Sequence, residues 1–105
     1  MFTSTFIFHA KPFDAEFHEL NNEIAARARE IPGFLGEEEW TNESGELHAE
    51  VYYWATRESM QQLIGMPIHR TAKGQSKRWI DDYRVVLSEV LTTYGTPGLG
   101  ITHAP

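Results

Sequence analysis

The stretch that decides the fold is "VYYWATRESMQQL", residues 51–63. Its first four residues are aromatic or β-branched, which is typical of a strand. Thr56 can then act as an N-cap, and Glu58 falls in the first turn of the following segment, where it suits the positive end of a helix dipole. The stretch therefore predicts a strand that passes directly into a capped helix.

The chain before this stretch predicts a strand followed by a helix. Residues 2–10 are rich in aromatic and β-branched types and stop before Pro12, whose missing N–H would interrupt a strand ladder. Asp14 can cap a helix in which apolar residues recur at steps of three and four positions as far as Ile31. Gly33 follows closely and ends that helix.

A hairpin and a last strand complete the order of elements. The segments 34–41 and 47–55 flank the turn-forming residues "NESG", and segment 83–93, "YRVVLSEVLTT", is β-rich with an apolar centre. Between them, Pro67 can begin a further helical piece that runs to about Trp79. The order predicts an α+β, ferredoxin-like split βαβ sandwich, in which two helices cover one face of a four-stranded antiparallel sheet.

The strands are apolar on both faces, which predicts a partner for the sheet. Leu47, Val51 and Tyr53 share one parity, whereas Tyr52 and Trp54 share the other. A sheet with water on one face would alternate strictly between apolar and polar residues. Because an exposed apolar face of several hundred square ångströms is unusual on a monomer, we expect a homodimer packed sheet against sheet.

Composition bounds the classes of function. The 105 residues suit one domain, expected at 1–95, followed by a tail or arm at 96–105 that carries Gly and Pro. The absence of cysteine excludes thiolate nucleophiles and iron-sulfur clusters, and the net charge of -6 argues against nucleic acid as a partner. No stretch approaches the roughly 18 apolar residues of a membrane helix, so we expect a cytoplasmic protein with no membrane partner.

The sequence resembles the antibiotic biosynthesis monooxygenase (ABM) family of the dimeric α/β-barrel superfamily over roughly residues 3–94. The resemblance implies a dimer whose two sheets form a barrel, with a pocket between sheet and helices in each protomer. Characterised members oxygenate phenolic polyketides, hydroquinones or anthrones with molecular oxygen and no cofactor, while a related branch degrades haem. The resemblance rests on "IPGFLGEEEW" (31–40), "YYWATRESMQQL" (52–63), "MPIHRTAKGQ" (66–75) and "WIDDYRVVLSEV" (79–90).

The haem-degrading branch has a residue pattern that this sequence lacks. That branch pairs an Asn on the first strand with a Trp in the second helix and a haem-ligating His about ten residues later. Alignment from Trp54 places His9, Leu63 and Lys73 at or near these three positions. His69 lies about one helical turn before the ligand position, so haem binding through His69 stays an alternative.

Two histidines and three aromatic residues are the candidate site residues. His69 could act as the general base that abstracts a phenolic proton at neutral pH, and His9, near the end of the first strand, could reach the same pocket. The structural alternative is a histidine that packs or bonds locally at the rim. Trp54, Trp79 and Tyr83 could stack against a flat substrate, although such residues are more often part of the core.

The sequence thus favours a cofactor-independent monooxygenase acting on a small aromatic phenol, hydroquinone or anthrone-like substrate. A haem-binding or haem-degrading enzyme, a barrel isomerase or decarboxylase, and a non-catalytic ligand-binding barrel are the alternatives. No metal site is predicted at Glu37, Glu38 and Glu39, because neighbouring residues of a strand point to opposite faces.

Overall fold

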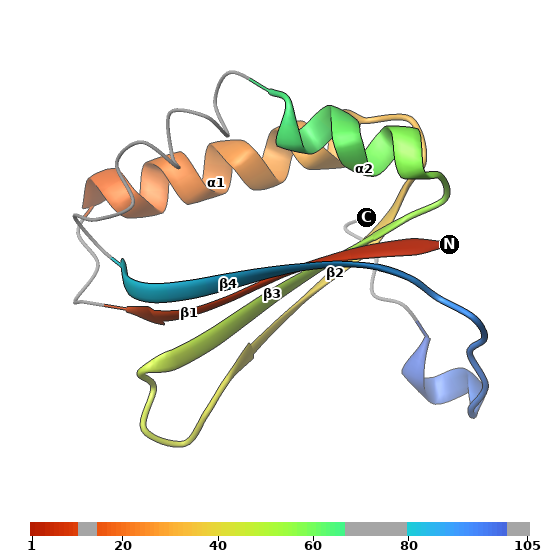
Figure 1. Ribbon diagram of the computed structural model, residues 1–105. Helices are drawn as coiled ribbons and strands as arrows, with labels where there is room; N and C mark the ends of the chain where they lie inside the picture. The colour runs from red at the N-terminus through yellow and green to blue at the C-terminus, as the bar shows by residue number, and fades with distance from the viewer. Residues whose placement is uncertain (11–14, 67–79, 101–105) are drawn as a thin grey trace.

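The computed structural model describes residues 1–10, 15–66 and 80–100. Its four strands form one antiparallel sheet in the order β2-β3-β1-β4, and both helices lie on the same face of that sheet (Figure 1). This is the predicted α+β, ferredoxin-like fold. In chain order the elements are β1 (Phe2–Ala10), α1 (Ala15–Glu30), β2 (Phe34–Thr41), β3 (Leu47–Trp54), α2 (Arg57–Ile64), β4 (Ile80–Glu89) and the 3₁₀ turn η2 (Pro97–Leu99).

Strand β3 lies between β1 and β2, and its alternation decides which side chains meet the helices. Trp54 points to the helix side, where it is fully buried, and its indole Nε1 donates a hydrogen bond to Ser4 Oγ at 3.0 Å. Tyr52 packs against Trp54 on this side, whereas Val51, which has the opposite parity, points to the other face. Both faces carry apolar side chains, as predicted, and Trp40 on the uncovered face is 60% exposed.

The core on the helix side is divided into two clusters. The larger one joins α2 and the end of α1 to β3 and contains Ala28, Ile31, Trp54, Met60 and Leu63. The smaller one joins the beginning of α1 to β1 and β4 and is formed by Phe8 and Ile80, with Phe6, Phe17 and Leu20 packed against it. Among the helices of the described residues, none has the length and apolarity needed to cross a membrane.

The start of α2 is tied to the turn that follows α1. Thr56 is the N-cap, as predicted, and its Oγ1 accepts a hydrogen bond from Ser59 N at 3.1 Å. Ser59 Oγ in turn donates to Pro32 O at 2.6 Å. Gly33, the next residue, has φ of 98°, and a Cβ built there would lie 2.2 Å from Ser59 Oγ. Only glycine therefore allows this close approach between the turn and the helix.

Strand β4 is shifted relative to the prediction of 83–93. It runs from Ile80 to Glu89 because these residues are the partners of Ala10 and Phe2, the two ends of β1. Beyond Glu89 the strand has no further β1 residue to pair with, and only Val90 N reaches Met1 O, at 2.9 Å. The predicted helix from Pro67 to Trp79 and the predicted Asp14 cap lie outside the described residues.

Replacement of Gly33 by alanine is expected to destabilise the fold more than the same change at Gly45. Both glycines have positive φ, at 98° and 78°, so both variants carry backbone strain of about 1–3 kcal/mol. Gly33→Ala also displaces Ser59, whereas a Cβ at Gly45 has nothing within 4 Å. Urea denaturation should show an additional loss of about 1–3 kcal/mol for Gly33→Ala, the range for overpacking. Equal losses in the two variants would contradict the steric explanation.

Candidate functional site

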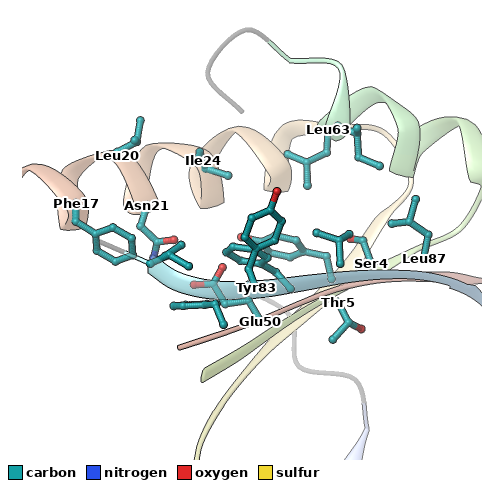
Figure 2. Close-up of a pocket in the computed structure, with 16 residues that line it drawn as sticks. Ser4, Thr5, Phe17, Leu20, Asn21, Ile24, Glu50, Leu63, Tyr83 and Leu87 are labelled. Atoms are coloured by element: carbon teal, nitrogen blue, oxygen red, sulfur yellow. The ribbon is translucent and has the colours of Figure 1, made fainter. Parts of the chain in front are cut away.

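A cavity of about 400 Å³ lies between the sheet and the two helices (Figure 2). We call it the apolar cavity, because most of its lining is aromatic or aliphatic. Among the described residues, its polar lining is Ser4, Thr5, Asn21 and Glu50, its aromatic lining is Phe6, Phe8, Phe17, Tyr52 and Tyr83, and its aliphatic lining is Leu20, Ile24, Leu63, Ile64, Ile80, Val85 and Leu87.

The periodicities of helix and strand bring these residues together. On α1, Phe17, Leu20 and Ile24 recur at steps of three and four positions and therefore share the face that meets the sheet. On β4, Tyr83 and Leu87 are opposite Phe8 and Ser4 of β1, so alternation directs them to the same side. Figure 2 shows residues from α1, α2 and the strands surrounding this space.

One carboxyl group, that of Glu50, lies among the described residues of this lining. Glu50 has the same parity on β3 as Tyr52 and Trp54, so it extends to the helix side of the sheet. Asn21 on α1 hydrogen-bonds to it, and the two side chains point toward each other in Figure 2. Burial, followed by repulsion from Glu39, raises the pKa of Glu50 to about 7.

A second, polar cleft of about 320 Å³ lies beside the apolar cavity. In it Arg29 donates from Nε to Glu37 Oε1 at 2.9 Å and also from Nη2 to the same oxygen, which raises the pKa of Arg29. Glu39 is the direct cross-strand partner of Glu50. We call this space the acidic cleft; its lining is Asn21, Asn22, Ala25, Arg29, Glu37, Glu38, Glu39, Glu50 and Tyr52.

The sequence-predicted site residues have different places in the structure. Tyr83 lines the apolar cavity and is 52% exposed. Trp54 lies in the core beneath the helices, and His9 is exposed near the end of β1; neither belongs to the described lining. His69 and Trp79 lie outside the described residues. Within the described ranges, no group of three or more His, Asp or Glu side chains could hold a metal ion.

The sequence interpretation missed Glu50 and Asn21. The signal for Glu50 was present, because a charged residue two and four positions before Tyr52 and Trp54 must share their face of the strand. Asn21 likewise lies four positions after Phe17, on the apolar face of its helix. Polar residues at positions that a periodic pattern directs inward are candidates for function, since burial of an ionisable group carries a cost.

Comparisons with known proteins give the same fold at low identity. SnoaB, a cofactor-independent oxygenase from Streptomyces nogalater, has a TM-score of 0.72 and 15% identity, covering 88% of this chain and 94% of that one. Rv0793 from Mycobacterium tuberculosis has a TM-score of 0.74 and 12% identity, covering 90% and 98%. A structure described as antibiotic biosynthesis monooxygenase has a TM-score of 0.70 and 15% identity, covering 88% and 100%.

These structures confirm the resemblance to antibiotic biosynthesis monooxygenases at the level of the fold. No protein-family model matches the sequence, and no curated protein is significantly similar to it. At 12–15% identity, the residues of the cavity rather than the shared backbone must carry any argument about chemistry.

Glu50→Gln is expected to stabilise the protein at alkaline pH. The pKa of Glu50 is about 7 in the folded protein against 4.5 ordinarily, so its contribution to stability is present below pH 4.5 and is lost as the pH rises through 7. Between pH 4 and pH 8 this group should lower the free energy of unfolding of the wild type by up to about 3 kcal/mol. Urea denaturation at the two pH values should show that Glu50→Gln lacks this loss. Glu46→Gln, a change at the exposed hairpin, is the control. An unchanged pH dependence in Glu50→Gln would contradict the raised pKa.

Proposed function

We propose that this protein is a cofactor-independent monooxygenase that oxidises an aromatic phenol, hydroquinone or anthrone-like substrate with molecular oxygen. The observation that carries the proposal is an apolar cavity whose described lining includes a single carboxyl group. Its volume of about 400 Å³ falls in the range of about 300–1,000 Å³ that is typical of small-molecule pockets. The fold shared with SnoaB supports the proposal but does not carry it.

The chemistry that we propose needs a base and an apolar space, and the substrate supplies the electrons. For an anthrone the balance is R₂CH₂ + O₂ → R₂C=O + H₂O. Removal of a proton leaves an electron-rich anion, which transfers an electron to oxygen; the two radicals combine to form a C–O bond, and loss of water leaves the ketone. The aromatic and aliphatic walls suit both the flat substrate and the apolar oxygen molecule.

The candidate residues from the sequence keep proposed roles in this scheme. Tyr83 is the one that lines the apolar cavity, so we assign it to stacking against the substrate ring. Trp54 supports the neighbouring wall through its contacts with Phe34 and Tyr52. His69 remains a candidate base, Trp79 a candidate wall residue and His9 a candidate rim residue. Haem binding through His69 is the alternative, and its candidate ligand lies outside the described residues.

We propose further that the protein acts as a homodimer formed through the uncovered face of the sheet. Val86 and Trp40 on that face are 39% and 60% exposed. The segment after β4 adds apolar side chains that lie in water, since Leu91 is 95% and Tyr94 96% exposed. A second copy placed on this face would bury both sets, which favours a dimer on hydrophobic grounds.

Filling the apolar cavity is expected to abolish oxygen uptake. Ile24→Trp places a large ring inside the cavity, whereas Ala26→Trp places the same ring on the exposed face of α1. With the 1,8-dihydroxyanthrone dithranol as substrate, an oxygen electrode should record uptake by the wild type and by Ala26→Trp. For Ile24→Trp we expect a fall in kcat/KM of at least about 100-fold, equivalent to about 2.7 kcal/mol of transition-state binding.

The same assay separates the alternatives. Incorporation of ¹⁸O from ¹⁸O₂ into the product, followed by mass spectrometry, identifies monooxygenation. Tight binding of dithranol without uptake would contradict the enzyme and favour a ligand-binding barrel. A Soret shift on addition of haemin that is lost in His69→Ala would favour the haem alternative.

A charge on the uncovered face is expected to break the dimer. Val51→Asp introduces a carboxylate in the centre of this face, where burial against a second copy would be costly. Ala26→Asp adds the same charge on the exposed face of α1 and should leave the dimer intact. Sedimentation velocity at micromolar concentration should show a dimer for wild type and Ala26→Asp and a monomer for Val51→Asp. A wild-type monomer would refute the proposal.

A further inference from the structure

Glu50 lies at the boundary between two cavities of different character. The apolar cavity and the acidic cleft share three lining residues, Asn21, Glu50 and Tyr52. On one side Glu50 meets a space walled by aromatic and aliphatic groups, and on the other it meets the carboxylates of β2. A carboxyl group in this position can exchange a proton with a molecule in the apolar cavity and with water in the cleft.

The charged groups around Glu50 favour its protonated form and do not neutralise the negative charge of its ionised form. Arg29 donates two hydrogen bonds to Glu37, so its guanidinium group pairs with Glu37 rather than with Glu50. Glu39 lies directly across the strand pair from Glu50, and like charges in that position repel. Among the described residues, the titratable and charged groups on the elements around Glu50 are Glu37 and Glu39 on β2, Arg29 on α1, His48 and Tyr52 on β3 and Tyr83 on β4.

Hydrogen bonding gives Glu50 a fixed orientation as well. Asn21 binds its carboxyl group from α1, which favours the ionised form and opposes the effect of burial. Tyr52, the next residue on the same face, is itself held neutral, because burial and then the charge of Glu50 raise its pKa. Of Glu50 and Tyr52, Glu50 is therefore the group that changes charge near neutral pH, the condition under which general base catalysis is most effective.

We propose that Glu50 is the catalytic base of the oxygenation, taking the proton from a hydroxyl or enol group of a substrate bound in the apolar cavity. The assignment rests on the proposed function for the fate of the resulting anion. The acidic cleft lets the carboxyl group equilibrate with solvent between turnovers. Because Glu50 and the carboxylates next to it in the described lining repel anions, we assign the substrate to neutral aromatic molecules that carry a free hydroxyl or an enolisable ketone.

Every proton that Glu50 accepts during the reaction is later returned. In the first step the O–H bond of the substrate breaks and a carboxyl O–H bond forms, so that the negative charge moves from Glu50 to the substrate. After oxygen has added, Glu50 returns its proton to the peroxide anion, which gives the hydroperoxide. The Glu50 carboxylate then takes the C–H proton as the C=O bond forms and the O–O bond breaks, and it passes this proton to the departing hydroxide, which leaves as water. Molecular oxygen is the oxidant, and the substrate is the electron donor.

An anaerobic experiment tests the base separately from the oxygenation. Under argon at pH 8, wild type mixed with dithranol should form the coloured enolate, measured by its visible absorbance. Glu50→Gln should lose at least about 10-fold of this signal, and under air its kcat should fall by about 100-fold or more, the usual contribution of a general base. Glu46→Gln removes a carboxylate from the exposed hairpin and should match the wild type in both assays.

The pH profile supplies a readout that a structural role would not move. Wild-type kcat/KM should fall on the acid side with a midpoint near pH 7, because the base of the free enzyme must be ionised. Glu39→Gln removes the neighbouring charge and should shift this midpoint downward by about 0.5–1 pH unit, the size of one nearby charge. This variant also decides the question if Glu50→Gln does not fold, which circular dichroism would reveal.

Three results would overturn the proposal. They are enolate formation in Glu50→Gln at the wild-type level, an unmoved midpoint in Glu39→Gln, and loss of the enolate in His69→Ala but not in Glu50→Gln. Enolate formation without oxygen uptake in wild type would instead refute the oxygenase function and leave Glu50 as a base. The failure of each hypothesis is therefore distinguishable from the failure of the other.

Discussion

The alternation of side chains along β3 is the constraint on which the rest of the molecule depends. Because β3 is paired on both edges, a shift by one residue would turn all of its side chains to the other face. The burial of Trp54, fixed by its hydrogen bond to Ser4, excludes that shift. Tyr52 and Glu50 must then lie on the helix side as well. Trp54, Tyr52 and Glu50 thus form a row that begins in the buried core and ends at a charged residue.

The two described helices cover different parts of this row. Helix α1 has 16 residues and spans about 24 Å at 1.5 Å per residue, whereas α2 has eight and spans about 12 Å. The shorter helix covers the sheet around Trp54 and ends at Ile64, which is where the lining of the cavity begins. Among the described residues, the charged end of the row lies beside the apolar cavity and the acidic cleft and not in the closed core. Such a pairing of burial and access is typical of functional carboxyl groups.

The sequence predicted the elements whose signals are local. The Thr56 cap, the hairpin around "NESG" and the period of α1 depend on neighbours within a few residues, and the structure agrees with each of them. The limits of β4 depend on a distant partner, since Ile80 and Glu89 are matched to the two ends of β1. Composition alone could not show where β4 begins and ends. Asp81 and Asp82 are of a type that is depleted in strands, so the predicted strand began only after them.

The site was less predictable than the fold for a related reason. Histidine and tryptophan are candidates for function by residue type alone, whereas Glu50 becomes a candidate only through the cavity and the charges around it. Strand parity could have placed it inward, but the approach of Asn21 and the position of Glu39 depend on how α1 and β2 pack against β3. The neighbouring Glu37 and Glu39 share that face, and only Glu38 between them points away, so alternation gathers carboxylates around Glu50.

Chemistry that joins oxygen to an aromatic anion makes two opposite demands on a protein. Oxygen and the aromatic ring favour an apolar enclosure, but the proton that must leave the ring favours a polar group with access to water. A uniformly apolar cavity would hold the substrate in its unreactive neutral form, and a polar one would hydrate the anion and lower its reactivity. In the proposed reaction Glu50, the one carboxyl group in the described lining of the apolar cavity, would meet both demands from the wall that this cavity shares with the acidic cleft.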